Sequence, residues 1–484
     1  MKNIFFKNEN RLVDRAILFV GIIFRLLYGL KATLFVNQHD VLLEGGHFHY
    51  ASHIFSTLAL PNSRYGQFYQ PPLNAIMQAL FMRLEMIFIK PVAALNKTLN
   101  LYLSGDYNLL FENKKLYDYI EILYSNTKIL SIIYSILTLF LIYKILKLTV
   151  YIHKRIYYVS LIMCSIFPGV VYLAGQYNND SLSYLFIFLS IYLSLIWYKE
   201  QKLSTIILLS ISISLGMLTK ISTSTVAFVI ALMMLIVLVN AIRKQDKAQV
   251  KNILIQWLIF AIITIPFALS YSIRNLILFN QPFNYVRKLA ESNPLYVKND
   301  NLFDRLFPFY FSRIVVPKYN IYHALNEFNI WIDLIKTSIL GEYTYGNFSY
   351  YFANVIMLFC GILIYLFSII SYIVVFAYYA LRVIKYRANL LSKLDLKYLL
   401  IGLSLALMTI GITSFTFFNL NYPASCSSHF RYIMYVIFAS SVLIPAFFDI
   451  LSKCLNAKVV TISYSFYTII LILGLATFTF IALL

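Results

Sequence analysis

Eleven apolar runs, each close to the length that a helix needs to cross a lipid bilayer, constrain this chain more than any other feature. A spanning helix requires about 20 predominantly apolar residues. The runs therefore predict an all-α polytopic membrane protein with about 11 transmembrane helices. They lie at roughly 16–36, 127–147, 157–174, 181–198, 203–219, 223–242, 253–272, 352–380, 398–418, 431–450 and 460–483.

The composition agrees with this prediction, because 60% of the residues are hydrophobic and only 12% are charged. The chain nevertheless carries 40 Lys and Arg against 20 Asp and Glu, for a formal net charge of +20. In a soluble protein that excess would raise the question of nucleic acid. Here most of it lies in short segments between apolar runs, which is typical of the positive-inside rule. We expect a lipid membrane, and no nucleic acid, as the partner.

The basic connectors also predict the orientation of the chain. Cytoplasmic loops are enriched in Lys and Arg, and with 11 spans all the basic segments fall on one side. We expect a cytoplasmic N-terminus in a multi-pass protein of the cell membrane, the plasma or inner membrane of a bacterium. The segments are the N-terminal arm and residues 143–158, 198–202, 241–251, 380–397 and 451–458.

Residues 72–89 test this scheme, because they are apolar enough to form a further span that would reverse the side of every later connector. Arg83 and Glu85 lie in the middle of this run, where a charge is costly at the bilayer centre. We expect an amphipathic helix on the outer face, and the alternative is a twelfth span paired with a weak one elsewhere. The predicted organisation is one integral domain over 1–484, with a first outer loop at 37–126 that holds interfacial helices and a large outer loop at 273–351.

The first outer loop opens on a crowd of polar residues. QHDVLLEGGHFHYASHIF places Asp40 and Glu44 directly after the first span, and ionisable residues at a membrane boundary are functional candidates by default. His47, His49 and His53 follow at near-helical spacing and superficially suggest zinc. No Cys or acid completes a tetrahedral set, so we expect these histidines to pack beside aromatic residues.

Two later segments place more polar residues on the same face. GQFYQPPL sets Gln70 before two prolines, which discourage helix before them and mark the start of a helix at 72. YNNDSLSY sets Asn179 and Asp180 at the edge of the fourth span, where an Asp can simply cap the helix. A functional role is favoured because Asp40 and Asp180 both lie at outer ends of early spans, which a bundle can bring together.

Cations at outer boundaries run against the positive-inside trend. Lys220 follows the fifth span in GMLTK, Arg274 lies where the seventh span ends, and His429 and Arg431 lie at the mouth of the tenth. A lysine at such a place can simply extend its amine to the interface. Several cations on one face are typical of a site for an anionic ligand such as a lipid-linked phosphate, because Lys and Arg give charge-assisted hydrogen bonds to its oxygens.

Taken in sequence order, the polar motifs of this chain resemble those of the GT-C superfamily of integral membrane glycosyltransferases. The resemblance is strongest to bacterial members related to protein O-mannosyltransferases and aminoarabinose transferases. The matching pieces are QHD, FYQPPL, YNNDSLSYLF, GMLTK, RNLILFNQPF and HFRYIMYVIF, between about residues 16 and 440. Two positions depart from the family pattern. Gln70 stands where relatives often carry His or Lys, and Val41 stands where protein mannosyltransferases carry a second acid.

The resemblance implies a hexosyltransferase that moves a sugar from a polyprenyl-phosphate donor to a protein, lipid or glycan acceptor on the outer face, usually with inversion. The family's first-loop acid corresponds to Asp40, the candidate general base for the acceptor hydroxyl. Asp180 would support that base, or share a divalent ion such as Mg²⁺ or Mn²⁺ with Asp40 if one is used. From their position on one face and the ordered motif match, we expect the donor phosphate to be bound by Arg274, His429, Arg431 and Lys220, and the substrate by Glu44, Gln70 and Asn179.

Two other functional classes remain open on the sequence. A transporter or flippase of a lipid-linked or anionic solute would also use outer-face cations, but it is expected to show broken helices with polar groups near the midplane. Arg25 and Lys31 in the first span are the exceptions that favour it. A polysaccharide polymerase or ligase would rely on Arg and His in large outer loops.

Overall fold

The computed structural model describes residues 6–35, 46–62, 68–88, 122–283, 285–286, 288, 296–297, 302–307, 309, 329–341, 351–386 and 395–483. Within these ranges the chain is helical and forms no sheet, so it is an all-α polytopic membrane protein. Asp40 and Glu44 lie outside the described residues.

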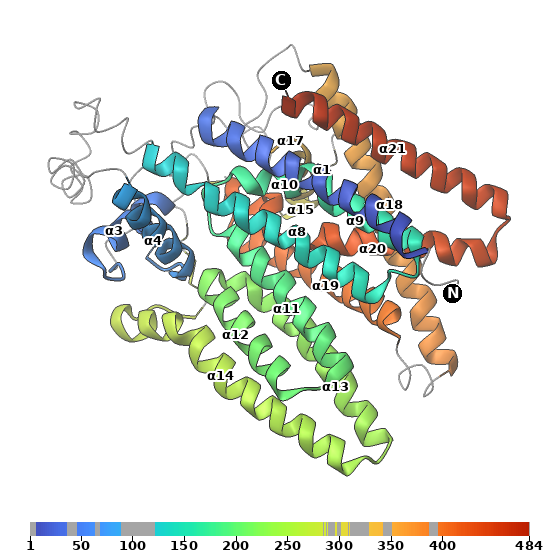
Figure 1. The fold of residues 1–484 in the computed structure, drawn as a ribbon, viewed down its shortest axis with the longest axis horizontal. Coiled ribbons are helices and arrows are strands. Elements are labelled where there is room, and N and C mark those ends of the chain that lie inside the picture. Colours follow the sequence, from blue (N-terminus) through green and yellow to red (C-terminus); the bar gives the residue numbers. More distant parts are fainter. Residues whose placement is uncertain are drawn as a thin grey trace.

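The long helices run side by side as a bundle (Figure 1). Each predicted apolar run overlaps a helix. They are α1 (Phe6–Phe35), α8 (Ile129–Thr149), α9 (Lys154–Ile166) with α10 (Pro168–Tyr172) and η1 (Leu173–Gly175), α11 (Asp180–Glu200), α12 (Leu203–Thr219), α13 (Ser224–Arg243), α14 (Lys247–Phe279), α18 (Tyr351–Tyr386), α19 (Leu396–Asn421), α20 (Tyr435–Cys454) and α21 (Ala457–Leu483).

Seven helices of the described residues are long and apolar enough to cross a membrane, or eight if the bent pair α9–α10 counts as one span. The apolar helix α12 and the apolar part of α21 are shorter. The predicted total of about 11 transmembrane helices therefore stays a prediction. Helix α20 is the most enclosed candidate, with 83% of its apolar window buried, and it packs against α9, α18 and α19.

The bend between α9 and α10 explains the arginine in the first span. Pro168 has no N–H, so the carbonyl of Cys164 one turn earlier lacks its helical donor. Arg25 reaches across from α1 and donates to that carbonyl at 3.1 Å and to the carbonyl of Ser165 at 2.6 Å. It also donates to Ser135 of α8 at 3.0 Å. Arg25 is buried, and it holds three helices together at the bend.

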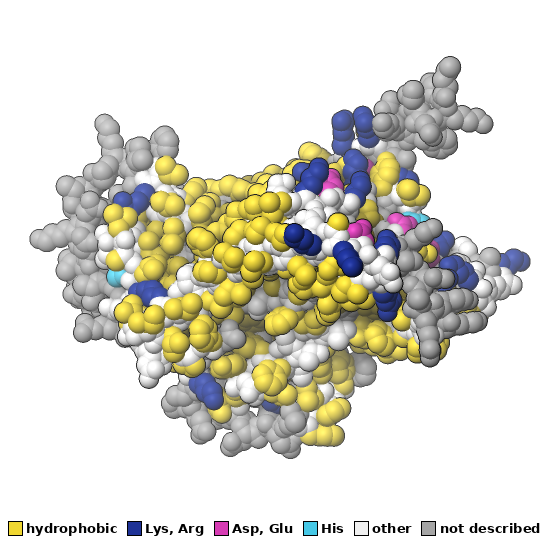
Figure 2. Space-filling model, turned by 90° about the horizontal axis from the view of Figure 1, so that it is seen from below, with side chains coloured by type: hydrophobic (Ala, Val, Ile, Leu, Met, Phe, Trp, Pro, Cys, Tyr) yellow, Lys and Arg dark blue, Asp and Glu magenta, His cyan; other side chains and the backbone are white. Residues whose placement is uncertain are grey.

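Two of the basic connectors meet beside the end of α20. Asp449 of α20 pairs with Arg155 at 3.4 Å and with Lys397 at 3.4 Å. The Lys397 amine also lies 3.2 Å from Nδ1 of His153. These contacts join connectors that the charge pattern predicts on one side of the membrane. Figure 2 shows Lys and Arg side chains gathered toward the right of the view, beside a broad hydrophobic surface.

Two short helices, α3 (His47–Thr57) and α4 (Leu73–Phe88), form a separate unit at the left of the bundle (Figure 1). Their shared core includes Phe48 of α3 and Met82 of α4. Arg83 donates to the Phe55 carbonyl at 2.6 Å, and Glu85 accepts from Asn126. Helix α4 is not among the candidate spans of the described residues, and its interfacial placement stays a prediction.

Candidate functional site

A buried carboxylate at the start of α11 is the centre of the candidate site. Asp180 is the first residue of α11, and its side chain is 3% exposed. One of its oxygens accepts a hydrogen bond from the Lys220 amine, and the other lies 3.7 Å from Nε of Arg431. Three segments far apart in sequence therefore bring one acid and two cations together.

Asp180 does not act as the helix cap, which was the simple alternative for this position. Asn179 holds the N-cap position, and the Oδ1 of Asn178 accepts from the Asp180 N–H at 2.9 Å. The Asp180 carboxylate is consequently free to face the neighbouring helices. Within the motif NND, Asn178 therefore binds the first N–H of the helix, and Asp180 contributes the buried carboxylate.

Lys220 lies in the turn between α12 and η2 (Ile221–Thr223). Its amine is 4.3 Å from the centre of the Tyr432 ring, in addition to its pairing with Asp180. Burial lowers the pKa of this amine, the Asp180 carboxylate opposes that shift, and Arg431 adds to it. Lys220 is therefore enclosed in the site, and does not simply extend to the interface.

Arg431 is held by its backbone on both sides. It lies in η5 (Phe430–Tyr432), and its carbonyl accepts a hydrogen bond from the Tyr184 hydroxyl. Its N–H donates to Nδ1 of His429 at 3.0 Å. His429 thus caps the short helix that presents the guanidinium. The Arg431 side chain stays 22% exposed, so its charge faces the edge of the cluster.

A helix that the sequence did not predict supports this segment. Helix α17 (Ile330–Leu340) lies on α18, and Thr337 of α17 accepts from the Phe430 N–H at 3.0 Å. Asp333, also on α17, accepts from the Ser428 hydroxyl. The Phe430 ring lies so close to Gly169 that a Cβ there would be 2.5 Å from it. Residues 428–431 are therefore fixed from two directions.

His47 is the site residue that sequence reasoning assigned to scaffolding. It begins α3, and the charges of Arg431, Asp180 and Lys220 all act on its ring. Burial, and then the two cations, lower the pKa of His47 to about 4, while Asp180 works in the opposite direction. His47 is therefore neutral at pH 7 and adds a hydrogen-bonding ring to the cluster without adding charge. Its membership of the same loop as Asp40 was the available signal.

A chain of amides and hydroxyls joins α3, the QPP turn and α14 to this cluster. Asn179 donates to Gln70 Oε1 at 2.9 Å, next to Asp180 in sequence. The Tyr50 hydroxyl lies 2.9 Å from that of Tyr271 and donates to the Gln70 carbonyl at 3.1 Å. The two predicted substrate residues Gln70 and Asn179 are thus in direct contact.

Arg274 lies at the same end but has other partners. It donates to the Pro61 carbonyl at 3.0 Å and to Asn275 at 2.9 Å, and its guanidinium lies over the rings of Tyr271 and Phe279. These contacts attach the end of α14 to the segment after α3. Among the described residues its recorded contacts do not include the Asp180 cluster.

Of the two predicted metal ligands, Asp180 lies among the described residues and Asp40 does not. No group of three or more potential ligands occurs among the described residues, and Asp40 lies outside them. Both oxygens of Asp180 already face cations. A divalent ion would have to approach against those two positive charges, so Asp180 as it stands does not fit the role of a metal ligand.

Comparison with known families places part of the chain. Residues 125–269 match the family model of dolichyl-phosphate-mannose-protein mannosyltransferase. This range is less than a third of the chain, and it contains Asp180 and Lys220 but not Arg431. The match is consistent with an integral membrane glycosyltransferase of the GT-C type. A search of curated proteins finds no match.

Proposed function

We propose that this membrane glycosyltransferase takes a hexose from a polyprenyl-phosphate donor and transfers it to an acceptor hydroxyl on the outer face of a bacterial plasma membrane. The observation that carries the proposal is the pairing of Lys220 and Arg431 on one buried carboxylate, Asp180. A lipid-linked phosphate entering from the bilayer would meet both cations. Protein, lipid and glycan acceptors are all compatible with this site.

The proposed reaction is a single displacement at the anomeric carbon. The acceptor oxygen forms a bond to C1 as the bond between C1 and the phosphate oxygen breaks, and the proton of the acceptor hydroxyl passes to Asp40. The electron pair of the broken bond stays on the polyprenyl phosphate. Asp40 lies outside the described residues, and its role as base rests on the family resemblance.

The cations matter most where charge develops. The donor is a phosphodiester with one negative charge, and the departing polyprenyl phosphate gains a second. Lys220 and Arg431 attract this developing charge more strongly than the charge of the donor, which lowers the barrier rather than only tightening binding. Asp180 then positions the two cations, and His47 supplies a neutral donor or acceptor beside them.

The other predicted residues fall into supporting roles. We place Gln70 and Asn179 beside the sugar, because their hydrogen bond lies next to the cluster. Arg274 would hold the entrance formed by α14 and the segment after α3, and His429 would orient Arg431. Glu44, outside the described residues, stays a candidate for acceptor binding.

The transporter alternative gains one observation, the 49° bend between α9 and α10. Broken helices in transporters expose backbone groups to a bound solute or ion. Here Arg25 occupies the freed carbonyls, which leaves no recognition role for the bend. A transferase therefore accounts for the polar groups better than a transporter or flippase does.

The test is an assay of the purified full-length chain with polyprenyl-phosphate sugars and a mixture of acceptors. Release of polyprenyl phosphate with glycosylated product supports transfer, whereas intact donor moved across a vesicle membrane supports transport. Asp40→Asn should abolish release, and Asp246→Asn, which removes an acid at the opposite end of α14, should not. Full activity of Asp40→Asn in a correctly inserted protein would refute the mechanism.

A further inference from the structure

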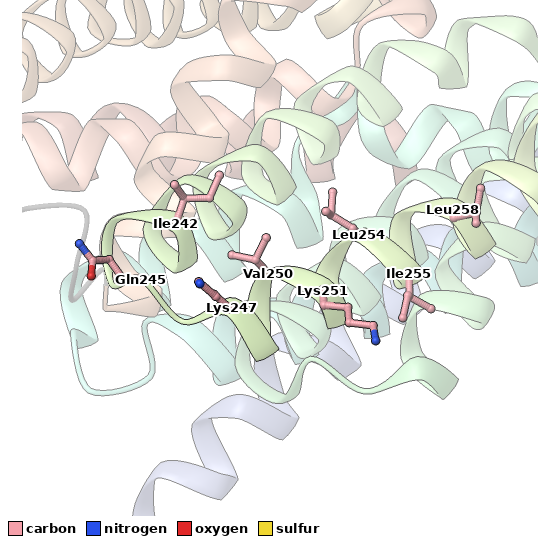
Figure 3. A pocket seen from close by; sticks show the side chains of 8 residues that line it. All are labelled: Ile242, Gln245, Lys247, Val250, Lys251, Leu254, Ile255 and Leu258. Carbon is pink, nitrogen blue, oxygen red and sulfur yellow. The ribbon is translucent and has the colours of Figure 1, made fainter.

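The hairpin of α13 and α14 carries a hollow that the proposed reaction does not use. Figure 3 shows it between the end of α13 and the first three turns of α14. Its volume is about 670 Å³, within the usual size range of small-ligand sites. Its lining includes Lys247, Lys251, Leu254, Ile255 and Leu258.

The lining has two parts with different chemistry. Lys247 and Lys251 lie near the turn, whereas Leu254, Ile255 and Leu258 continue along α14 away from it. From Lys247 to Leu258 the helix rises about 16 Å. That order, cations first and aliphatic side chains after them, matches the order of a phosphate head group and an acyl chain in one bilayer leaflet.

The charge around the turn is uncompensated. Arg243 and Lys244 end α13 just before the turn and add to the positive charge of Lys247 and Lys251. The one acid of the turn, Asp246, is occupied as the cap of α14, where it accepts from the Gln249 N–H at 2.9 Å. In the part of the chain that the structure describes, none of these four cations forms an ion pair.

The hollow is too far from the Asp180 cluster to hold the same ligand. Lys251 and Arg274 lie on one helix and are separated along it by about 35 Å, which exceeds the roughly 30 Å hydrocarbon core. A phosphate bound near Arg274 therefore lies close to the other surface of the membrane. The occupant of the hollow has to come from the leaflet at the end that holds the basic connectors.

We propose that the α13–α14 hollow binds one anionic phospholipid of that leaflet, with its phosphate on Lys247 and Lys251 and an acyl chain along Leu254, Ile255 and Leu258. Helix α14 has only 22% of its apolar window buried inside the protein, the lowest share among the candidate spans. A lipid bound in the hollow would cover part of this exposed helix. The proposal is independent of the reaction at the Asp180 cluster.

The test measures lipid retention by the purified full-length chain in neutral detergent. Native mass spectrometry compares phosphatidylglycerol with phosphatidylcholine of the same acyl chains, at a series of lipid concentrations. The wild type should hold one phosphatidylglycerol in preference to phosphatidylcholine. Lys247→Gln combined with Lys251→Gln should weaken that preference about 25-fold, because each lysine near an anionic group contributes about fivefold.

Two further variants separate a defined site from general charge attraction. Lys453→Gln with Lys458→Gln removes two exposed cations at the same end of the molecule and should leave the preference unchanged. Leu254→Trp fills the hollow without a change in charge and should also remove the bound lipid. Equal losses in the two lysine pairs, or wild-type retention by Leu254→Trp, would overturn the proposal.

Discussion

Replacing Asp180 with Asn should destabilise the protein by far more than the loss of one hydrogen bond. The carboxylate is 3% exposed and faces two cations, which would remain enclosed without an opposite charge. At 3.7 Å and an effective dielectric constant of about 20, Coulomb's law gives an attraction of about 4–5 kcal/mol between Asp180 and Arg431. Removal of one partner of a buried ion pair costs about 3–5 kcal/mol, and we expect a loss in this range.

The pairing itself is measured by a double-mutant cycle. Lys220→Met alone leaves the acid with only Arg431, whereas Asp180→Asn with Lys220→Met removes one charge of each sign. The double variant should therefore lose less stability than the sum of the single variants, by about 1–3 kcal/mol. Asp180→Glu keeps the charge and should retain most of the wild-type stability.

The assay is reversible unfolding in a detergent titration, followed with a thiol-reactive dye. Cys164 and Cys360 are buried and become reactive when the bundle opens, provided that Cys426 and Cys454 are replaced by Ser. Asp246→Asn serves as the matched control, because it removes an exposed carboxylate while the Asn side chain still caps α14, so it should cost less than about 1 kcal/mol. If Asp180→Asn costs no more than this control and the cycle is additive, the buried ion pair is not formed and the reasoning fails.

Three other predictions follow from single contacts. Arg25→Leu should lower the free energy of unfolding by at least about 3 kcal/mol in the same titration, because two buried carbonyls at the α9–α10 bend lose their donor. As a control, Arg155→Leu breaks an exposed ion pair and should lower it by about 1 kcal/mol or less. Thr337→Val should raise the KM for donor, with Thr337→Ser close to wild type, because the Phe430 N–H loses its acceptor; unchanged KM would contradict this. Burial holds the pKa of His47 at about 4, below its ordinary 6.5, so the unfolded chain binds more protons between these values and stability declines as pH falls from about 7 to 4. His47→Gln should flatten that decline in titrations repeated across this range, and an identical slope would count against the assignment.

The helices were predictable because hydrophobicity is a local property. Each apolar run overlaps a helix, and the two prolines before residue 73 mark the start of α4 as expected. The bounds were less predictable. Helix α14 extends well beyond the predicted run 253–272, since hydropathy does not register the turns that continue past a bilayer. The third run bends at Pro168, and Arg25 makes that bend stable.

The site was predictable only in part, because its partners come from distant segments. Asp180, Lys220 and Arg431 were named from their positions at span ends, and the structure brings them together. Helix α17 was missed, since 11 residues with an acid and a lysine in the middle do not look like a span, and the residues it supports lie about 90 positions later. The sequence does not distinguish His47 from His49 and His53, because only the tertiary fold places one of the three beside the cations.

The pairing of Asp180 also changes what the site requires of its ligand. Counted at their usual charges, the acid and the two cations leave one net positive charge, which in the proposed reaction matches the single charge of a donor phosphodiester. A second metal-like charge would favour the doubly charged product over the donor and slow its release. A site without the acid would have the same fault, with the added cost of two unpaired cations. In the proposed reaction, the buried carboxylate would therefore keep the positive charge high enough to stabilise the departing phosphate and low enough to release it.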